Sequence, residues 1–526
     1  MAFVHAQRPG ASLVDLSSVA FENTFVRELP GDPVPLNTRR QVRNASYTLV
    51  APTPVASPRL LAWSDALGEQ LGLARPAPAC LTVDALGGNR VLPGMEPYAA
   101  RYGGHQFGHW AGQLGDGRAI TLGELVARDG SRQELQLKGA GKTPYSRSAD
   151  GRAVLRSSLR EFLCSEAMHW LGVPTTRALS LVGTGEQVMR DMFYDGNAAP
   201  EPGAVVCRVA PSFVRFGNFQ IHTANEEPEV LKRLVDYVLR RHFPALGSTR
   251  DWYHEVCRRT AVLMSDWMRL GFVHGVMNTD NMSILALTID YGPYGWLEGY
   301  DPDWTPNTTD AEGRRYCYGN QPQIAQWNLM RLAEALLPIM PKEELEAGLK
   351  LYGDTYRESF SKALAQKLGL DALESGDDGL VSEMFGVLGA LETDFTLFFR
   401  GLSSVQDSTD NVRLLAPLAR AFYAEPGAAH VARVAAWLRL YLVRVGAPAA
   451  VRAQRMNAVN PKYVPRNYLA QQAIDSLTQG DACVLERLMK VLERPYDEQP
   501  ENNDLAARRP EWARNKAGCS ALSCSS

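Results

Sequence analysis

Oxygen-bearing side chains with the spacing of a metal–nucleotide site gather between His274 and Pro293. Asp280 and Asn281 are adjacent, and Asp290 opens an Asp-Tyr-Gly sequence after a short apolar run. Carboxylate and amide oxygens are ligands that Mg²⁺ prefers in proteins. We therefore expect Asn281 and Asp290 to hold Mg²⁺, with Mn²⁺ as the alternative, bound to the phosphates of ATP.

The spacing of this segment matches that of a protein-kinase catalytic loop. Such a loop has a histidine, an asparagine seven positions later, and then the aspartate of an Asp-x-Gly motif. His274, Asn281 and Asp290 keep this order, but Val276 replaces the aspartate that kinases use as catalytic base. Asp280 is the nearest carboxylate, so we expect it to act as the base. A polar turn followed by an Asp-Gly turn is the alternative, which the spacing and the flanking apolar residues disfavour.

A lysine and a glutamate further upstream have the arrangement that holds ATP phosphates in kinases. Lys138 ends an alternating run that begins at Glu134, which predicts a half-buried strand with Lys138 and Gln136 on one face. Apolar residues at the helical period predict a helix over 153–171, which carries Glu161. A surface lysine and a solvated glutamate are the alternative. The order of glycine loop, strand lysine and helix glutamate favours a lysine–glutamate pair.

Two further segments contain residues suited to phosphate contacts. Gly115, Gly117 and Arg118 lie close together, and glycines let backbone N–H groups approach phosphate oxygens, although a tight hairpin explains them equally well. Arg208 and Arg215 are seven residues apart and could clamp a phosphate through paired hydrogen bonds. Two surface arginines are the alternative.

A P-loop is excluded, although Gly141-Lys142-Thr143 resembles the end of one. The full motif needs a glycine five positions before Gly141, and that position is Gln136. We therefore interpret Lys142 as a solvated lysine.

The elements that must position these residues form a mixed strand and helix region followed by a mainly helical region. The sequence predicts a strand over 283–289 and helices over 251–270, 323–337, 342–368 and 428–445. We expect an α+β fold with a protein-kinase-like two-lobed core. The predicted units are an N-terminal extension packed on the core (1–95), an N-lobe (96–205), a C-lobe (206–400) and a helical C-terminal region with a cysteine-containing tail (401–526).

Composition excludes several classes of protein. The 526 residues carry a formal net charge of −3, whereas a protein whose main function is to bind nucleic acid is usually basic. No run of about 18 apolar residues is present, and the N-terminus lacks the apolar core of a signal peptide, so we expect a cytoplasmic protein with no membrane contact. The eight cysteines form no Cys-x-x-Cys pair, which disfavours a zinc site.

Several long motifs, in order along most of the chain, resemble the selenoprotein O family, the YdiU-type pseudokinase-like AMP transferases. They are Arg101-Tyr-Gly-Gly-His-Gln-Phe-Gly108, Leu135 to Arg147, Asp150 to Glu161, His274 to Asp290, Asn320-Gln-Pro322, Asn460-Pro461 and Arg466-Asn467.

The resemblance implies a kinase-like fold that holds ATP in a flipped orientation and transfers AMP to Ser, Thr or Tyr hydroxyls of proteins. It assigns Lys138 and Glu161 to an ion pair, Arg208 and Arg215 to the phosphate pocket, Asp280 to the base, and Asn281 and Asp290 to the metal. Asp150 and Gly151 open one of the motifs, and we assign them to the ATP site as well. The alternatives are UMP transfer, ordinary phosphoryl transfer, or a catalytically dead scaffold that binds nucleotide.

The resemblance also implies a redox-active cysteine near the C-terminus, matched here by Cys524, and a role in oxidative-stress regulation. In bacterial relatives this cysteine pairs with one after the Asp-x-Gly motif, but the position that aligns there is Pro306. Cys317 and Cys519 are the substitutes, and a disordered tail with incidental cysteines is the alternative. Because Cys519 and Cys524 lie in a terminal segment rich in serine, we expect both to be exposed and mobile.

Overall fold

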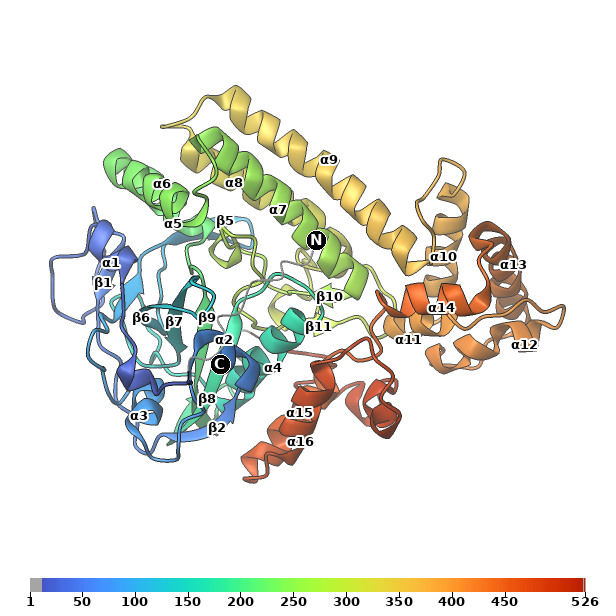
Figure 1. Cartoon of the computed structure of the whole chain (residues 1–526), viewed down its shortest axis with the longest axis horizontal. Coiled ribbons are helices and arrows are strands. Elements are labelled where there is room, and N and C mark those ends of the chain that lie inside the picture. Colours follow the sequence, from blue (N-terminus) through green and yellow to red (C-terminus); the bar gives the residue numbers. More distant parts are fainter. Residues whose placement is uncertain (1–11, 524, 526) are drawn as a thin grey trace.

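The computed structural model describes residues 12–523 and 525, and its central feature is a seven-stranded antiparallel sheet (Figure 1). The strand order is β1-β3-β6-β7-β9-β8-β2. The strands are β1 Tyr47–Leu49, β2 Arg59–Trp63, β3 Tyr98–Ala100, β6 Ala119–Val126, β7 Arg132–Lys138, β8 Arg177–Arg190 and β9 Ala199–Ala210. Helices and strands are both abundant, so the predicted α+β class is confirmed.

Both edges of this sheet come from the predicted N-terminal extension. β1 and β2 are the outermost strands, so this region forms part of the sheet as well as packing against it. It also contributes the short helices α1 Thr24–Glu28, α2 Asp65–Leu71 and α3 Leu81–Gly87. The boundaries of the four predicted units remain predictions.

Side chains of the central strands alternate between two layers of helices, as the two-residue period of a strand requires. Val205 and Cys207 of β9 pack in the core that includes α2 and α3. Ala204 and Val206 point the other way and pack against α4 Leu155–Trp170. Polar residues of the central strands that point toward α4 are therefore close to Glu161 on that helix.

A second region of the molecule is built from helices that share one large core. α7 Thr249–Leu270, α8 Gln321–Leu336 and α9 Lys342–Lys367 run side by side (Figure 1), close to the ranges predicted from the sequence. Gly271 ends α7 with a φ of 73°, a left-handed conformation that glycine adopts without a Cβ clash. The same core includes α5 Phe216–Ala224 and α6 Pro228–His242.

The C-terminal helices form a separate core and then return to the sheet. The first group is α10 Asp378–Ala390, α11 Phe395–Leu402, α12 Asn411–Leu415, α13 Ala428–Val445 and α14 Ala449–Asn457. The returning helices, α15 Asn467–Thr478 and α16 Cys483–Leu492, pack against α4. Two small sheets complete the fold, formed by β4 Gly103–Gln106 with β5 His109–Gln113 and by β10 Phe272–Val273 with β11 Gly295–Trp296.

The prediction of a strand over 283–289 is wrong. Ser283 and Thr288 each form a single bridge, with Arg215 and Thr175 respectively, and no ladder joins them. Ala286 between them has a φ of 54°, so the chain turns where a strand would have to stay extended. The apolar residues of this segment are buried as a loop.

Within the described part of the chain, no single helix is both long and apolar enough to cross a membrane. α13 and α14 reach that length and composition only when taken together, and they are bent by 95° relative to each other.

Candidate active site

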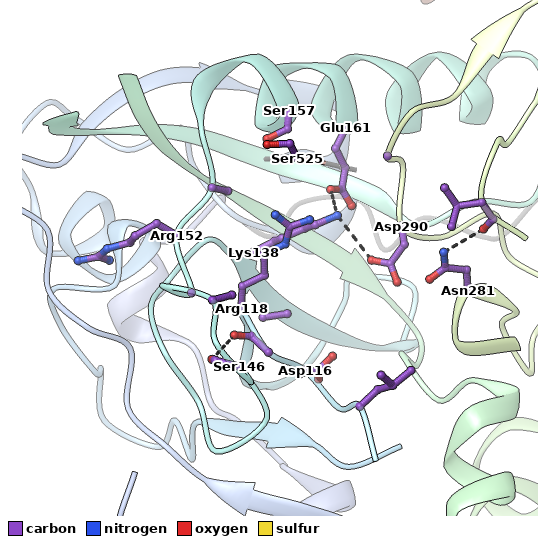
Figure 2. Close-up of a pocket in the computed structure, with 18 of the residues that line it drawn as sticks. Asp116, Arg118, Lys138, Ser146, Arg152, Ser157, Glu161, Asn281, Asp290 and Ser525 are labelled. Carbon is purple, nitrogen blue, oxygen red and sulfur yellow. Dashed lines mark hydrogen bonds and ion pairs between the residues drawn. The ribbon is translucent and has the colours of Figure 1, made fainter. Parts of the chain in front are cut away.

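A cavity of about 720 Å³ beside the α4 face of the sheet collects most of the residues singled out from the sequence (Figure 2). Its lining includes Gly115, Gly117, Arg118, Lys138, Asp150, Gly151, Glu161, Arg208, Asp280, Asn281 and Asp290. Arg215 is not in the lining, and it lies behind Asp290 with a direct hydrogen bond to it.

The predicted lysine–glutamate pair is present. Lys138 at the end of β7 donates from Nζ to Oε2 of Glu161 at 2.6 Å, and the two side chains are 12% and 2% exposed. Leu135 and Leu137 point into the core on the opposite face of β7, which directs Lys138 toward α4. Burial lowers the pKa of Lys138, and the neighbouring carboxylates of Glu161 and Asp290 counter this by favouring its charged form.

Two buried arginines join this pair to Asp290. Arg208 lies directly opposite Gln136 across the β7–β9 ladder, so its side chain points to the same face as Lys138. It donates to Glu161 at 3.1 Å and also to Asp290, while Arg215 donates to the other carboxylate oxygen of Asp290. Three cationic side chains therefore surround the carboxylates of Glu161 and Asp290, and Asp116 and Asp280 line the same cavity.

Asp290 is held in an unusual backbone conformation as well as by charge. Its φ of 56° lies in the left-handed region, which few non-glycine residues adopt. The preceding carbonyl, of Ile289, contacts Nε2 of His274 at 2.8 Å, so the histidine of the motif ties the two halves of the segment together. Burial alone raises the pKa of Asp290, but the three surrounding cations outweigh it and hold the pKa well below its usual range.

Asp280 and Asn281 lie on a short 3-10 turn, Thr279–Asn281, on another wall of the cavity. Asn281 donates from Nδ2 to the carbonyl of Val276 at 2.9 Å, which fixes its amide. The side chain of Asp280 accepts a hydrogen bond from Gln106 at 3.3 Å on Oδ2, while its Oδ1 has no partner among the described residues. Burial raises the pKa of Asp280 to about 6.

The donor set fits a magnesium ion that a nucleotide helps to bind. Within residues 12–523 and 525, no three His, Cys, Asp or Glu side chains cluster as a complete metal site. Asn281 and Asp290 supply one amide and one carboxylate to the same cavity. Mg²⁺ usually takes only one or two protein carboxylates in nucleotide sites, since phosphates and water supply the other oxygens.

Comparison with known proteins agrees with the resemblance drawn from the motifs. The family model described as "Protein adenylyltransferase SelO" matches residues 37–493. The chain belongs to the SelO family.

Similar relatives of this SelO chain include three bacterial proteins, each named "Protein nucleotidyltransferase YdiU". The one from Nitrosospira multiformis is 62% identical, over 98% of this chain and 98% of its own. Those from Azoarcus sp. and Aromatoleum aromaticum are 58% and 57% identical, over 97% of this chain and 99% and 100% of theirs. The family recognised from the sequence, and with it the nucleotidyltransferase class, is confirmed.

The glycine segment of this SelO chain packs against another loop of the protein. A Cβ on Gly115 would lie 2.4 Å from Cγ of Tyr145, and one on Gly117 would lie 3.0 Å from the carbonyl oxygen of Tyr145. Thr143 donates to the carbonyl of Asp116 at 2.7 Å. The glycines therefore permit close packing of two loops at the rim of the cavity, and both loops line it.

Asp150 and Gly151 shape the second of these loops. Asp150 forms paired hydrogen bonds with Arg190 at 2.7 and 2.8 Å. Gly151 accepts a hydrogen bond from the N–H of Gly141 at 3.0 Å, and a Cβ on Gly151 would collide with Gly141. Lys142 is exposed and does not line the cavity, in agreement with the rejection of a P-loop.

Several polar residues of the site were not singled out from the sequence. Gln136 accepts from Arg208 and donates to Asp116 at 3.4 Å, and Arg160 donates to the carbonyl of Tyr294 at 2.8 Å. Gln136 shares a strand face with Lys138, and Asp116 lies between Gly115 and Gly117. Their positions in the sequence therefore gave a reason to include both residues in the predicted site. Nothing in the local pattern around Arg160 distinguishes it from other helix arginines.

The C-terminal segment lies against the same cavity, which the expectation of an exposed tail missed. Leu522, Ser523 and Ser525 line the cavity. Leu522 donates its N–H to the carbonyl of Pro306 at 2.9 Å, and Arg156 donates to the carbonyl of Ser525 at 3.2 Å.

The predicted exposure of Cys519 is wrong. This side chain is 3% exposed because it packs in the core formed by α4, α15 and α16, and Asn467 donates to its carbonyl at 2.8 Å. Cys317 is also buried, as a free thiol. Cys524 lies outside the described residues, so its disulfide and its redox role remain predictions. Pro306, where the resemblance would place the bridging partner, meets the tail through its backbone carbonyl.

Proposed function

We propose that this protein transfers AMP from ATP to Ser, Thr or Tyr hydroxyls of other proteins. The observation that carries the proposal is the convergence of Lys138, Arg208 and Arg215 on Glu161 and Asp290, in a cavity that also contains Asp280. Cationic groups that are buried and held in place before any ligand binds favour an anion such as a triphosphate.

We also propose that the catalytic core is kinase-like and two-lobed, with the N-lobe over 96–205 and the C-lobe over 206–400. A lysine on a central strand, paired to a helix glutamate and followed by a histidine-to-asparagine segment and an Asp-x-Gly motif, supports this arrangement.

The position of the buried cations favours AMP transfer over transfer of the terminal phosphate. Arg208 lines the cavity and Arg215 lies behind Asp290, and each is 2% exposed. If they bind the β- and γ-phosphates, the terminal phosphate lies buried and the α-phosphate lies nearer the opening. Val276 occupies the position of the kinase base, so the groups that would promote γ-phosphate transfer in a kinase are incomplete here.

In the proposed site, Asn281 and Asp290 would hold Mg²⁺ or Mn²⁺, which would neutralise phosphate charge. Binding of the triphosphate gives Arg208 and Arg215 new anionic partners, so they share their hydrogen bonds between Asp290 and the phosphates. Lys138 stays next to Glu161 and presents its remaining N–H groups to phosphate oxygens.

In the transfer step, the hydroxyl oxygen of the target residue attacks the α-phosphorus of ATP. The bond between the α-phosphorus and the oxygen that bridges to the β-phosphate breaks, and pyrophosphate leaves with that electron pair. Asp280 takes the hydroxyl proton on a carboxylate oxygen. A base with a pKa of about 6 is largely ionised at neutral pH and still basic enough to accept a proton. The product is an AMP ester of Ser, Thr or Tyr.

The test uses ATP labelled on the α-phosphate or, separately, on the γ-phosphate. Label that enters protein only from the α-position supports AMP transfer. Label only from the γ-position identifies a kinase, and label from neither identifies a scaffold that binds nucleotide without catalysis. A parallel reaction with α-labelled UTP distinguishes UMP transfer.

A further inference from the structure

The hairpin β4–β5 is separate from the main sheet and packs against the segment that carries Asp280. Among the described residues, its two strands pair only with each other, with Gln106 opposite His109 near the turn. β4 contacts α5 and the 3-10 turn Thr279–Asn281. The hairpin therefore forms the wall of the site next to the proposed base.

Three consecutive residues of the hairpin bind three consecutive residues of the catalytic segment. The N–H of His105 donates to Oγ1 of Thr279 at 2.7 Å. Gln106 donates from Nε2 to Oδ2 of Asp280 at 3.3 Å. The N–H of Phe107 donates to Oδ1 of Asn278 at 3.3 Å and to the hydroxyl of Tyr316 at 2.9 Å.

The hairpin is itself anchored to α5 and α8 through His105. The ring of His105 lies between Trp110 and Trp327, at centroid distances of 5.1 and 5.5 Å. Its Nδ1 contacts the amide nitrogen of Gln220 at 3.1 Å, and the amide oxygen of Gln220 accepts from Thr279 at 2.6 Å. One residue of α5 thus holds both the hairpin and the catalytic segment in a common position.

The two carboxylate oxygens of Asp280 have different surroundings because of this hairpin. Oδ2 is engaged by Gln106, whereas Oδ1 is buried and has no hydrogen-bond partner among the described residues. Gly104 lies beside Oδ1, and a Cβ at that position would be 2.4 Å from it. Gly104 is not in the left-handed region, so the constraint is the space next to Oδ1 and not the backbone conformation.

We propose that the β4–β5 hairpin positions the Asp280 carboxylate for catalysis, with Gln106 holding Oδ2 and the absence of a side chain at Gly104 letting Oδ1 pack against the hairpin. The inference rests on the proposed function and adds two positioning residues to it. A carboxylate held at Oδ2 by Gln106 and packed at Oδ1 against Gly104 cannot rotate freely, so the group stays at a fixed place in the wall of the site. A base must lie within hydrogen-bond reach of the proton it takes, and small misplacements reduce turnover strongly.

The test compares Gln106→Leu and Gly104→Ala with the wild type and with His109→Ala. His109 is exposed and lies opposite Gln106 in the hairpin, so its replacement controls for effects on the hairpin itself. Transfer from α-labelled ATP to a protein acceptor gives kcat and the KM for ATP, and thermal melting reports folding.

Loss of one hydrogen bond to the carboxylate should lower kcat about tenfold in Gln106→Leu, with the KM for ATP within about twofold of wild type. Gly104→Ala displaces the carboxylate and should lower kcat about 100-fold. His109→Ala should match wild type.

A double variant separates positioning from a general structural effect. If Gln106 acts through Asp280, then Gln106→Leu combined with Asp280→Ala should be no slower than Asp280→Ala alone. A further tenfold loss in the double variant would overturn the proposal, and so would an unchanged kcat in Gln106→Leu. An equal loss in His109→Ala would also overturn it.

Transfer by the wild-type protein separates failure of the positioning role from failure of the proposed AMP transfer. Absence of α-label from protein in wild-type reactions refutes the proposed function and the positioning role with it. Wild-type transfer that Gln106→Leu leaves unchanged refutes only the positioning role. Should Gly104→Ala fail to fold, the Gln106→Leu series decides the question.

Discussion

Replacement of Lys138 by methionine tests the charge balance of the deep site. Lys138 donates to Glu161 at 2.6 Å and lies 3.6 Å from Asp290. Methionine is unbranched and of similar length, so it can occupy the space of the Lys138 side chain at the end of β7. The substitution removes one of the three cations around the two carboxylates and leaves Arg208 and Arg215 in place.

The fold should survive this change because Glu161 keeps a partner. Arg208 still donates to Glu161 at 3.1 Å, so the buried carboxylate is not left unpaired, which would cost about 3–5 kcal/mol. Loss of one charge-assisted hydrogen bond should lower the free energy of unfolding by about 2 kcal/mol. Activity should fall much further. Removal of one preorganised donor from a site that stabilises developing charge typically costs about 10²–10³ in rate.

The assay measures transfer from α-labelled ATP together with thermal melting, for Lys138→Met and for Lys142→Met. Lys142 is exposed, lies four residues further along, and belongs to the rejected P-loop sequence, so its replacement is a matched control. We expect Lys142→Met to retain wild-type activity. Near wild-type transfer by Lys138→Met, or the same loss in both variants, would refute the phosphate role of Lys138. An unfolded Lys138→Met protein would show a structural role instead.

Three further predictions concern the metal, the base and the tail. Asp290→Ala should abolish metal-dependent nucleotide binding, as measured by calorimetry with and without Mg²⁺, and undiminished Mg²⁺ dependence would contradict the metal assignment. Asp280→Ala should lower kcat by about 10²-fold or more while the Kd for ATP changes little; an equal loss of ATP binding would make Asp280 a phosphate-site or metal-site residue. Cys524→Ser should remove any response of activity to reductant, and a wild-type Cys524 that stays fully alkylatable under oxidising conditions, with activity indifferent to reductant, would rule out a redox switch.

Local patterns in the sequence were sufficient to place the main chemical groups on their elements. Alternation of polar and apolar residues determined that Lys138 points away from the core, because a strand has a period of two. Helical periodicity identified the helix that carries Glu161, and Gly271 marked the end of α7. Spacing singled out Asn281 and Asp290, which line the same cavity, and their role as metal ligands stays a prediction. All of these features depend on residues within about one element of each other, so they can be read without knowledge of the fold.

The charge network required the pairing of strands that lie far apart in the chain. Arg208 reaches Glu161 and Asp290 because the β7–β9 register places it opposite Gln136, about 70 residues away in the sequence. The sequence could suggest a phosphate clamp, but it could not show that Asp290 is the partner of both arginines. The strand predicted over 283–289 failed for a related reason. Its apolar residues are buried by neighbouring elements, and the turn at Ala286 has no marker such as glycine.

Only the tertiary structure placed the hairpin and the C-terminal segment at the site. The contact of Gln106 with Asp280 spans 174 residues, and the contact of Leu522 with Pro306 spans more than 200. Cys519 was expected to be exposed from its neighbours in the sequence, yet α15 and α16 bury it. Sequence periodicity reports which side of an element is apolar. Packing of the whole chain decides which element covers that side and which loop contacts that element.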